Sequence, residues 1–281
     1  MRNSSYTTDW TKKVEARHDK NFGFEILKVL ILVLLVIFSI RSSYAQNAGG
    51  AIDFDGIDDT IAINGTFDPP DQGTIEFWID ADASDSRRLM GTHDAFEVRL
   101  DPDANGYIVD HQFFHGGDDT MHAVTVLPFG EWHHVALTWD FSTSVAEIYI
   151  DGLLDMSGNL ADDDPGAIAL TIGARTGKDG EYFDGRLDEV RIWSEIRTEQ
   201  QIQEFMNKGI VSPKNEAKLI AYWGFDEPAG TEVIDLSGNG FDGKMNNMDH
   251  VAARIASTAP VTLAVLPAGK LSTTWGVLKN Q

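Results

Sequence analysis

The chain of 281 residues is 42% hydrophobic and 23% charged, which is typical of a globular protein with one sizeable domain. It contains no cysteine, and this excludes a disulfide framework. The formal net charge of −22 repels polyanions and argues against nucleic acid as a partner.

The first 45 residues have the pattern of a secretory signal peptide. Residues 1–28 are polar, Val29–Ile40 is a largely apolar run too short to span a bilayer comfortably, and Ser43-Tyr44-Ala45 resembles a cleavage site. We expect cleavage after Ala45, a secreted or cell-surface protein, and no stable membrane span after cleavage. Cleavage removes seven of the 22 basic and four of the 44 acidic residues and leaves a net charge of −25. Two alternatives stay open: an initiator further downstream, and an uncleaved segment that serves as an anchor.

Short extended segments separated by turn residues fill most of the chain between Gly50 and Gly185. The segments are rich in β-branched and aromatic residues, and clusters of Gly, Asp, Pro and Asn separate them. Outside the hairpin and the closing strand described below, the expected strands cover residues 61–63, 74–79, 96–100, 107–114, 122–126 and 168–172. Many short strands at this spacing predict an all-β sandwich of two sheets.

The stretch Trp132–Gly152 predicts a long antiparallel hairpin. Residues 133, 135, 137 and 139 fall on one face of an extended segment, and a second β-branched run follows from Val145 to Ile150. Asp151-Gly152 is a strong turn signal because both residues tolerate a positive φ. The apolar face of such a hairpin needs a second sheet to cover it. Because His133 alternates with apolar residues, we expect it in the core.

Four segments, in chain order, resemble the laminin G-like jelly-roll family of the concanavalin A-like lectin/glucanase superfamily. They are the opening strand and loop Ala51–Asp59, the second strand Thr74–Ile79, the central hairpin with Trp-His-His-Val-Ala at 132–136, and the closing strand Phe183–Trp193. The resemblance covers about residues 50–207 and implies a two-sheet antiparallel jelly-roll sandwich. A fold of this kind hosts many activities, so the resemblance says more about structure than about function.

One helix is predicted after the closing strand. Thr198 and Gln201 form a capping box, an apolar stripe follows, and Gly209 ends the segment. A helix in this place is also what the resemblance implies. The laminin G-like domain is therefore expected to cover residues 46–207.

Residues 208–247 are expected to complete the same sandwich. Within them, Leu219–Met245 resembles the segment that usually precedes the opening strand in similar proteins. The alternative is the stub of a second repeat, although too few residues follow to build one. Residues 248–281 are expected to form a tail that is loosely ordered or serves sorting or attachment.

Four acidic residues are the predicted calcium ligands. Asp55, Asp58 and Asp59 share one glycine-containing loop, and Asp188 lies in the closing strand. Calcium selects carboxylate and backbone oxygens from loops, about six to eight for each ion. In similar laminin G-like domains, acids of the opening loop and the closing strand can lie near each other. The alternative is that these carboxylates cap turns by accepting backbone N–H groups.

The sequence offers little support for catalysis, and we predict no catalytic residues. Glycosidases that share this sandwich carry paired acids on one strand, as Glu-x-Asp-x-x-Glu, and the sequence contains no such run. We expect a secreted, non-catalytic recognition module that binds a glycan or an extracellular protein. Two other classes stay open: a glycoside-active enzyme of the same fold, and a structural cell-surface or adhesion protein.

Overall fold

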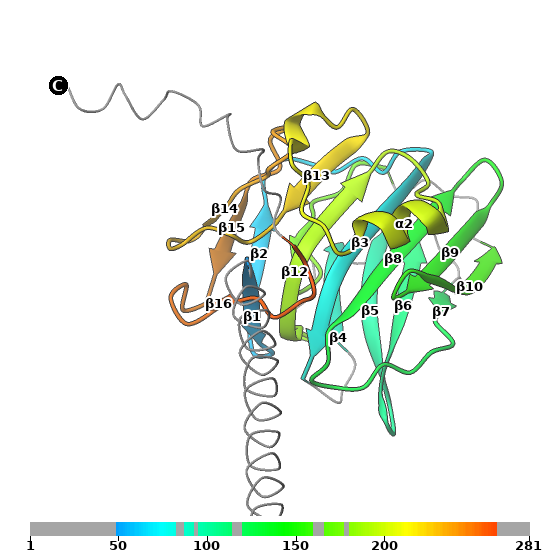
Figure 1. The fold of residues 1–281 in the computed structure, drawn as a ribbon. Coiled ribbons are helices and arrows are strands. Elements are labelled where there is room, and N and C mark those ends of the chain that lie inside the picture. The colour runs from blue at the N-terminus through cyan, green and yellow to red at the C-terminus, as the bar shows by residue number, and fades with distance from the viewer. Residues whose placement is uncertain are drawn as a thin grey trace, which may run out of the picture. The chain divides into compact units, whose positions relative to one another are not determined.

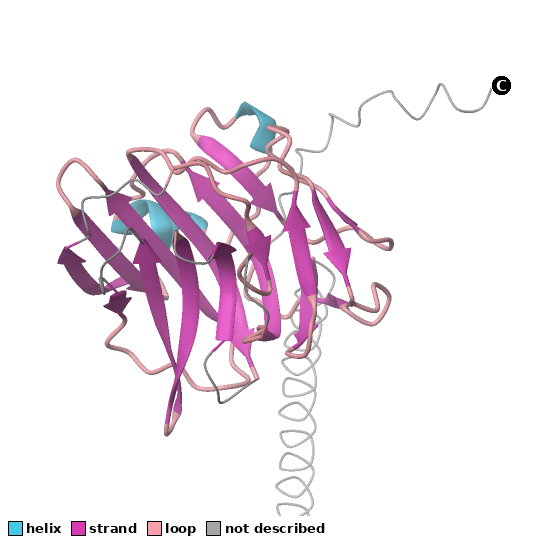
Figure 2. Cartoon of the chain, turned by 180° about the vertical axis from the view of Figure 1, so that it is seen from behind, coloured by secondary structure: helices cyan, strands magenta, loops and turns pink. Residues whose placement is uncertain are grey.

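Short strands pack as two antiparallel sheets in a computed structural model of the protein (Figures 1 and 2). The predicted signal peptide and the last part of the predicted tail lie outside the residues that the structure describes. No helix among those residues is long and apolar enough to cross a membrane. The structure describes residues 49–82, 87–92, 95–113, 120–159, 166–176 and 180–262, without the side chains of 112, 113 and 120.

The first sheet contains eight strands. Their bounds are β1 Gly50–Asp55, β3 Gln72–Ala81, β8 His133–Asp140, β9 Val145–Ile150, β10 Leu153–Asn159, β12 Asp184–Trp193, β13 Leu219–Trp223 and β16 Arg254–Ala256. The order is β10-β9-β8-β3-β12-β1-β16, and β13 pairs with the C-terminal end of β12. The closing strand β12 therefore lies in the middle of this sheet, between β3 and β1.

The second sheet also contains eight strands. Their bounds are β2 Thr60–Ile63, β4 Arg87–Thr92, β5 Phe96–Asp103, β6 Gly106–Phe113, β7 Thr120–His122, β11 Thr171–Ile172, β14 Glu232–Val233 and β15 Gly243–Asn246. The order is β14-β15-β2-β11-β4-β5-β6-β7. The opening loop of the sequence, between β1 and β2, thus carries the chain from one sheet to the other.

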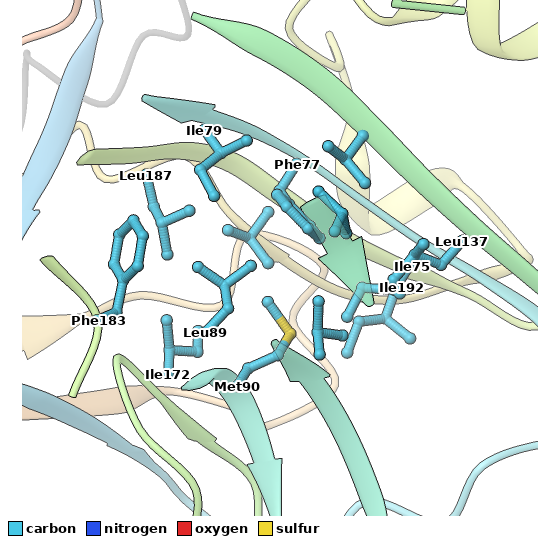
Figure 3. Close-up of a cluster of buried hydrophobic side chains, with 14 of the residues drawn as sticks. Ile75, Phe77, Ile79, Leu89, Met90, Leu137, Ile172, Phe183, Leu187 and Ile192 are labelled. Atoms are coloured by element: carbon cyan, nitrogen blue, oxygen red, sulfur yellow. The ribbon is translucent and has the colours of Figure 1, made fainter. Parts of the chain in front are cut away.

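The hydrophobic core lies between the two sheets. Ile75, Phe77 and Ile79 of β3 are at most 1% exposed, and they face Leu89 and Met90 of β4 (Figure 3). The alternating spacing of these residues places all three β3 side chains on one face of the strand. Full burial of each such side chain contributes about 1.5–3 kcal/mol to the free energy of unfolding.

A single α-helix, α2 (Glu199–Phe205), is present among the described residues, and the capping box is confirmed. Thr198 accepts from the backbone N–H of Gln201, whose side chain in turn accepts the N–H of Thr198 at 2.8 Å. Ile202 packs with Ala136 of β8 and Tyr149 of β9. The helix therefore covers the outer face of the first sheet, which is why that face is buried as well (Figure 1).

The predicted central hairpin is confirmed as β8 and β9, with β10 as a third strand after the Asp151-Gly152 turn. Both turn residues have positive φ, 49° and 80°. The expectation for His133 is confirmed for its side of the strand, because it pairs with Ile79 on the face of Val135 and Leu137, but not for full burial. His133 is half-buried and hydrogen-bonds to Asp151 at 2.9 Å, while His134 is 1% exposed beside the ring of Trp78. His133 stands at the first position of β8, at the margin of the core, and His134 is buried because the outer face of the sheet is covered as well.

The strand expected at 122–126 is also displaced, because β7 ends at His122. The backbone N–H groups of Val124 and Thr125 donate to the carboxylate of Asp155 at 2.5 and 3.2 Å. A side chain from a distant strand thus satisfies donors that would otherwise pair with a neighbouring strand.

The segment Leu219–Met245 supplies strands to both sheets. In the first sheet β13 pairs with β12, and in the second β15 pairs with β2. The structure differs from the expected tail boundary at residue 248, because β16 pairs with β1 at the edge of the first sheet. Arg254 anchors this strand, since its Nη1 donates to Glu227 at 2.9 Å and its Nε to the carbonyl of Gly230 at 3.1 Å.

Candidate functional site

The loop between β1 and β2 is held by its own carboxylates. Asp55 Oδ1 accepts the N–H of Ile57 at 2.9 Å, and Asp59 Oδ2 accepts the N–H of Asp55 at 3.1 Å. Gly56 has a φ of 71°, and a Cβ at this position would lie 2.7 Å from the Cβ of Asp184. Only glycine therefore fits where the loop passes the start of β12.

The three predicted loop ligands lie close together. Carboxylate oxygens of Asp55, Asp58 and Asp59 are all within 4.8 Å of one another. Among the described residues, none of the three forms an ion pair with a basic side chain. Burial raises the pKa of Asp59, and the charges of Asp55 and Asp58 raise it further, against the hydrogen bond from the Asp55 backbone. A bound cation would relieve this repulsion.

Two of these residues, Asp55 and Asp59, also line an acidic pocket of about 480 Å³. Phe54 and Asn247 also line it. Its six carboxylates come from β1, the opening loop, the end of β3, the start of β12 and the C-terminal segment: Asp53, Asp55, Asp59, Asp82, Asp184 and Asp249. Four distant parts of the sequence thus meet at one end of the sandwich.

Arg186 balances the charge at one wall of the acidic pocket. Its Nη1 donates to Asp80 at 2.7 Å and its Nη2 to Asp82 at 2.9 Å, and its Nε lies 3.5 Å from Asp53. The pKa of Asp53 is nevertheless raised. Burial is the main cause; the charge of Arg186 opposes it, and the charges of nearby carboxylates add to it. The acidic pocket is therefore partly neutralised at this wall and not at the opening loop.

The fourth predicted ligand, Asp188, lies elsewhere. It is 3% exposed, and its Oδ2 accepts from the hydroxyl of Ser257 at 2.5 Å. Burial raises its pKa well above the ordinary value, and the neighbouring Glu189 raises it further. Asp184 is the residue that stands opposite Asp55 in the pairing of β1 with β12. Because residues four apart on a strand are separated by about 13 Å, Asp188 cannot share that position.

Sequence reasoning missed Asp82, Asp184, Asn247 and Asp249. Asp184 had a usable signal, because it precedes Gly185 at the first position of the closing strand. Asp249 was assigned to the tail, and the remaining two residues lie at strand ends without a motif of their own. Their approach to the opening loop depends on strand order, which short motifs do not encode.

A second cluster, Asp101, Asp110 and His122, also brings ligand atoms within 4.8 Å. Here the charge is already balanced, since Asp110 accepts from Arg99 Nε at 2.9 Å and contacts His122 Nδ1 at 2.7 Å. Burial raises the pKa of Asp110 to about 6, and Asp101 adds to this effect. A guanidinium in the cluster disfavours a metal ion, so we interpret the cluster as an ion-pair network.

The comparison with known families agrees with this architecture. Residues 55–203 match the laminin G-like model described as the concanavalin A-like lectin/glucanases superfamily. The chain belongs to this superfamily. The matched residues run from the opening loop through the closing strand to α2, so they include the β1–β2 loop acids and Asp184 but not Asn247 or Asp249.

Two relatives and one solved structure are similar to this chain over part of their length. The mouse and rat proteins named Sushi, von Willebrand factor type A, EGF and pentraxin domain-containing protein 1 are 25% and 27% identical over 172 and 175 residues. Each match covers 56% of this chain and 5% of the relative. A candidate carbohydrate-binding protein from Bacteroides ovatus has a TM-score of 0.60 at 24% identity, covering 77% of this chain and 62% of that one. This likeness shows a shared fold.

Proposed function

We propose that the protein is a non-catalytic recognition module of the cell surface or extracellular space that binds a glycan at the acidic pocket. The observation that carries this proposal is a hollow of about 480 Å³ with six carboxylates at one end of a lectin-like sandwich. Hydroxyl groups of a sugar can donate to such carboxylates, and the volume is that of a ligand site rather than of one ion. The signal-peptide pattern and the candidate function of the B. ovatus protein support the proposal.

We further propose a calcium ion at the β1–β2 loop. Asp55, Asp58 and Asp59 supply hard oxygen ligands within 4.8 Å of one another, which suits calcium. Asp184 replaces Asp188 as the acid of β12 that faces this loop. A calcium ion would link the start of the sandwich to its closing strand and present part of its coordination shell to the acidic pocket.

The calcium proposal predicts opposite effects of Asp59→Asn with and without the ion. In chelator the variant should melt slightly above the wild type at neutral pH. Because the pKa of Asp59 is raised in the folded state, its protonated form stabilises the fold at low pH, and this contribution is lost as pH rises through the folded pKa. At neutral pH the charged carboxylate is therefore unfavourable, and the neutral Asn removes that charge. With calcium at a hundredfold excess over Kd, the wild type should gain about 2.7 kcal/mol and the variant far less.

The matched control for this melting experiment is Asp71→Asn, an exposed aspartate that does not line the acidic pocket. This control should keep the full response to calcium. Melting curves of the wild type that superimpose in chelator and in millimolar calcium would contradict the calcium site and leave the loop carboxylates as turn caps.

Glycan recognition is tested by an array screened with the full chain, with Asp59→Asn and with Asp71→Asn. We expect a retained glycan for the wild type and Asp71→Asn in calcium, with a loss of about tenfold or more in Asp59→Asn, because charge-assisted hydrogen bonds contribute about 1.5–3 kcal/mol each. If the wild type binds no glycan on the array but binds an extracellular protein that carries no glycan, the ligand is a protein and the glycan proposal is wrong. Turnover of a polysaccharide that one Asp or Glu substitution abolishes would overturn the non-catalytic assignment.

A further inference from the structure

A second pocket, of about 410 Å³, lies on the outer face of the first sheet between α2 and the connector 208–212. We call it the α2 pocket. None of its residues lines the acidic pocket. Three basic side chains, Arg191, Arg197 and Lys208, and a single acidic one, Glu216, line it. Basic side chains thus outnumber acidic ones at this pocket, whereas the whole chain has 22 basic and 44 acidic residues.

Arg197 is buried, fixed and incompletely paired. Its guanidinium lies 4.3 Å from the ring centroid of Trp193 and 5.3 Å from that of Phe205. The residue is 7% exposed, yet among the described residues the guanidinium has one hydrogen bond, from Nη1 to Glu195 at 3.0 Å. A planar guanidinium held between two rings is pre-organised to receive a carboxylate with little further loss of side-chain entropy.

Arg191 has a different role, because both of its Nη atoms are engaged. Its Nη1 donates to the carbonyl of Phe205 at 3.3 Å, and its Nη2 donates to the carbonyl of Lys208 at 2.6 Å and to Glu189. Arg191 therefore ties the end of α2 and the start of the connector to the sheet. These bonds fix the position of the connector at the α2 pocket, and Glu189 balances the charge of Arg191.

Apolar side chains and one exposed lysine also line the α2 pocket. Ile210 and Val211 line it together with Phe205, and Val211 and Phe205 are 51% and 38% exposed. Lys208 is exposed; its Nζ lies 5.4 Å from the ring centroid of Phe205 and forms a loose surface ion pair with Glu204 at 3.9 Å, which a ligand carboxylate can replace at little cost. Ligand pockets commonly join apolar walls to a few convergent polar groups in volumes of about 300–1,000 Å³.

We propose that the α2 pocket binds a small organic carboxylate with a short apolar body. The carboxylate group pairs with the donors of the Arg197 guanidinium that Glu195 leaves unpaired, and with Lys208. The apolar body lies against Phe205, Ile210 and Val211. A neutral sugar would leave the charge of Arg197 unused, so this site is separate from the proposed glycan site and its function.

Calorimetric titration of the full chain in chelator tests this site without interference from calcium at the acidic pocket. The probes are hexanoate, the neutral hexanol, and glucuronate, which carries the same charge on a polar body. We expect hexanoate to bind at least about tenfold more tightly than either, since a hydrogen bond to a charged group contributes about 1.5–3 kcal/mol. Lys208→Gln should weaken hexanoate binding, and Arg197→Lys should weaken it more by removing the planar fork.

Two further variants separate charge from folding. Lys244→Gln changes an exposed lysine of β15 outside the α2 pocket and should leave hexanoate binding unchanged. Glu216→Gln removes the carboxylate of the α2 pocket and should tighten binding by about two- to fivefold, as expected for one exposed charge. Equal affinities for hexanoate and hexanol, tighter binding of glucuronate, or equal losses in Lys208→Gln and Lys244→Gln would each overturn the proposal, as would an absence of hexanoate binding.

Discussion

Trp223→Ala is expected to lower the free energy of unfolding by about 3–5 kcal/mol, the range for truncation of a large buried aromatic side chain. Trp223 is fully buried in the core, and its Nε1 donates to the carbonyl of Phe241 at 2.8 Å. It belongs to β13, beyond the part of the chain that matches the family. A loss of this size would show that the C-terminal segment carries part of the core rather than an accessory repeat.

Chemical denaturation measures this effect, with Trp132→Ala as the control. Trp132 is half-buried at the surface and hydrogen-bonds to the hydroxyl of Thr258 at 2.9 Å, so its truncation leaves a smaller cavity or none. We expect the control to lose clearly less stability than Trp223→Ala. Equal small losses in the two variants would mean that the sandwich is stable without the C-terminal segment.

Glu76→Gln is expected to lower the free energy of unfolding by about 3 kcal/mol at neutral pH and by much less at low pH. Glu76 is 1% exposed, accepts from Trp193 Nε1 at 2.9 Å, and lies 3.6 Å from Arg191 Nη1. Burial alone would raise its pKa, but His134, Arg191 and Trp193 together lower it from 4.5 to about 2. A difference of this size corresponds to about 3 kcal/mol.

The direction of the pH dependence follows from the lowered pKa. A carboxylate with a depressed folded pKa stabilises the fold above its unfolded pKa, and this contribution is lost as pH falls from about 4.5 towards 2. The wild type and Glu76→Gln should therefore converge in stability across this range. The control, Glu204→Gln, changes a glutamate that is 55% exposed and should run parallel to the wild type. A constant difference between wild type and Glu76→Gln would contradict the assigned ion pair.

Local features of the fold were predictable because their signals are short. The Asp151-Gly152 turn and the Thr198–Gln201 capping box rest on residues within a few positions, and the structure confirms both. Strand periodicity was less informative where both faces are covered. Alternation put His133 on the side of Val135 and Leu137, but it did not indicate that His134, on the opposite side, would be buried beside Trp78.

The sequence by itself determined the all-β class, the positions of the main strands along the chain and the grouping of Asp55, Asp58 and Asp59 in one loop. Only the tertiary structure decided what meets that loop. The pairing of β1 with β12 brings Asp184 opposite Asp55 and sends Asp188 into a buried contact with Ser257. The pairing of β16 with β1 holds the segment of Asp249, which had been assigned to the tail, at the acidic pocket. The physical reason is that strand register and order arise from burial summed over whole sheets, whereas a motif reports only on its own neighbours.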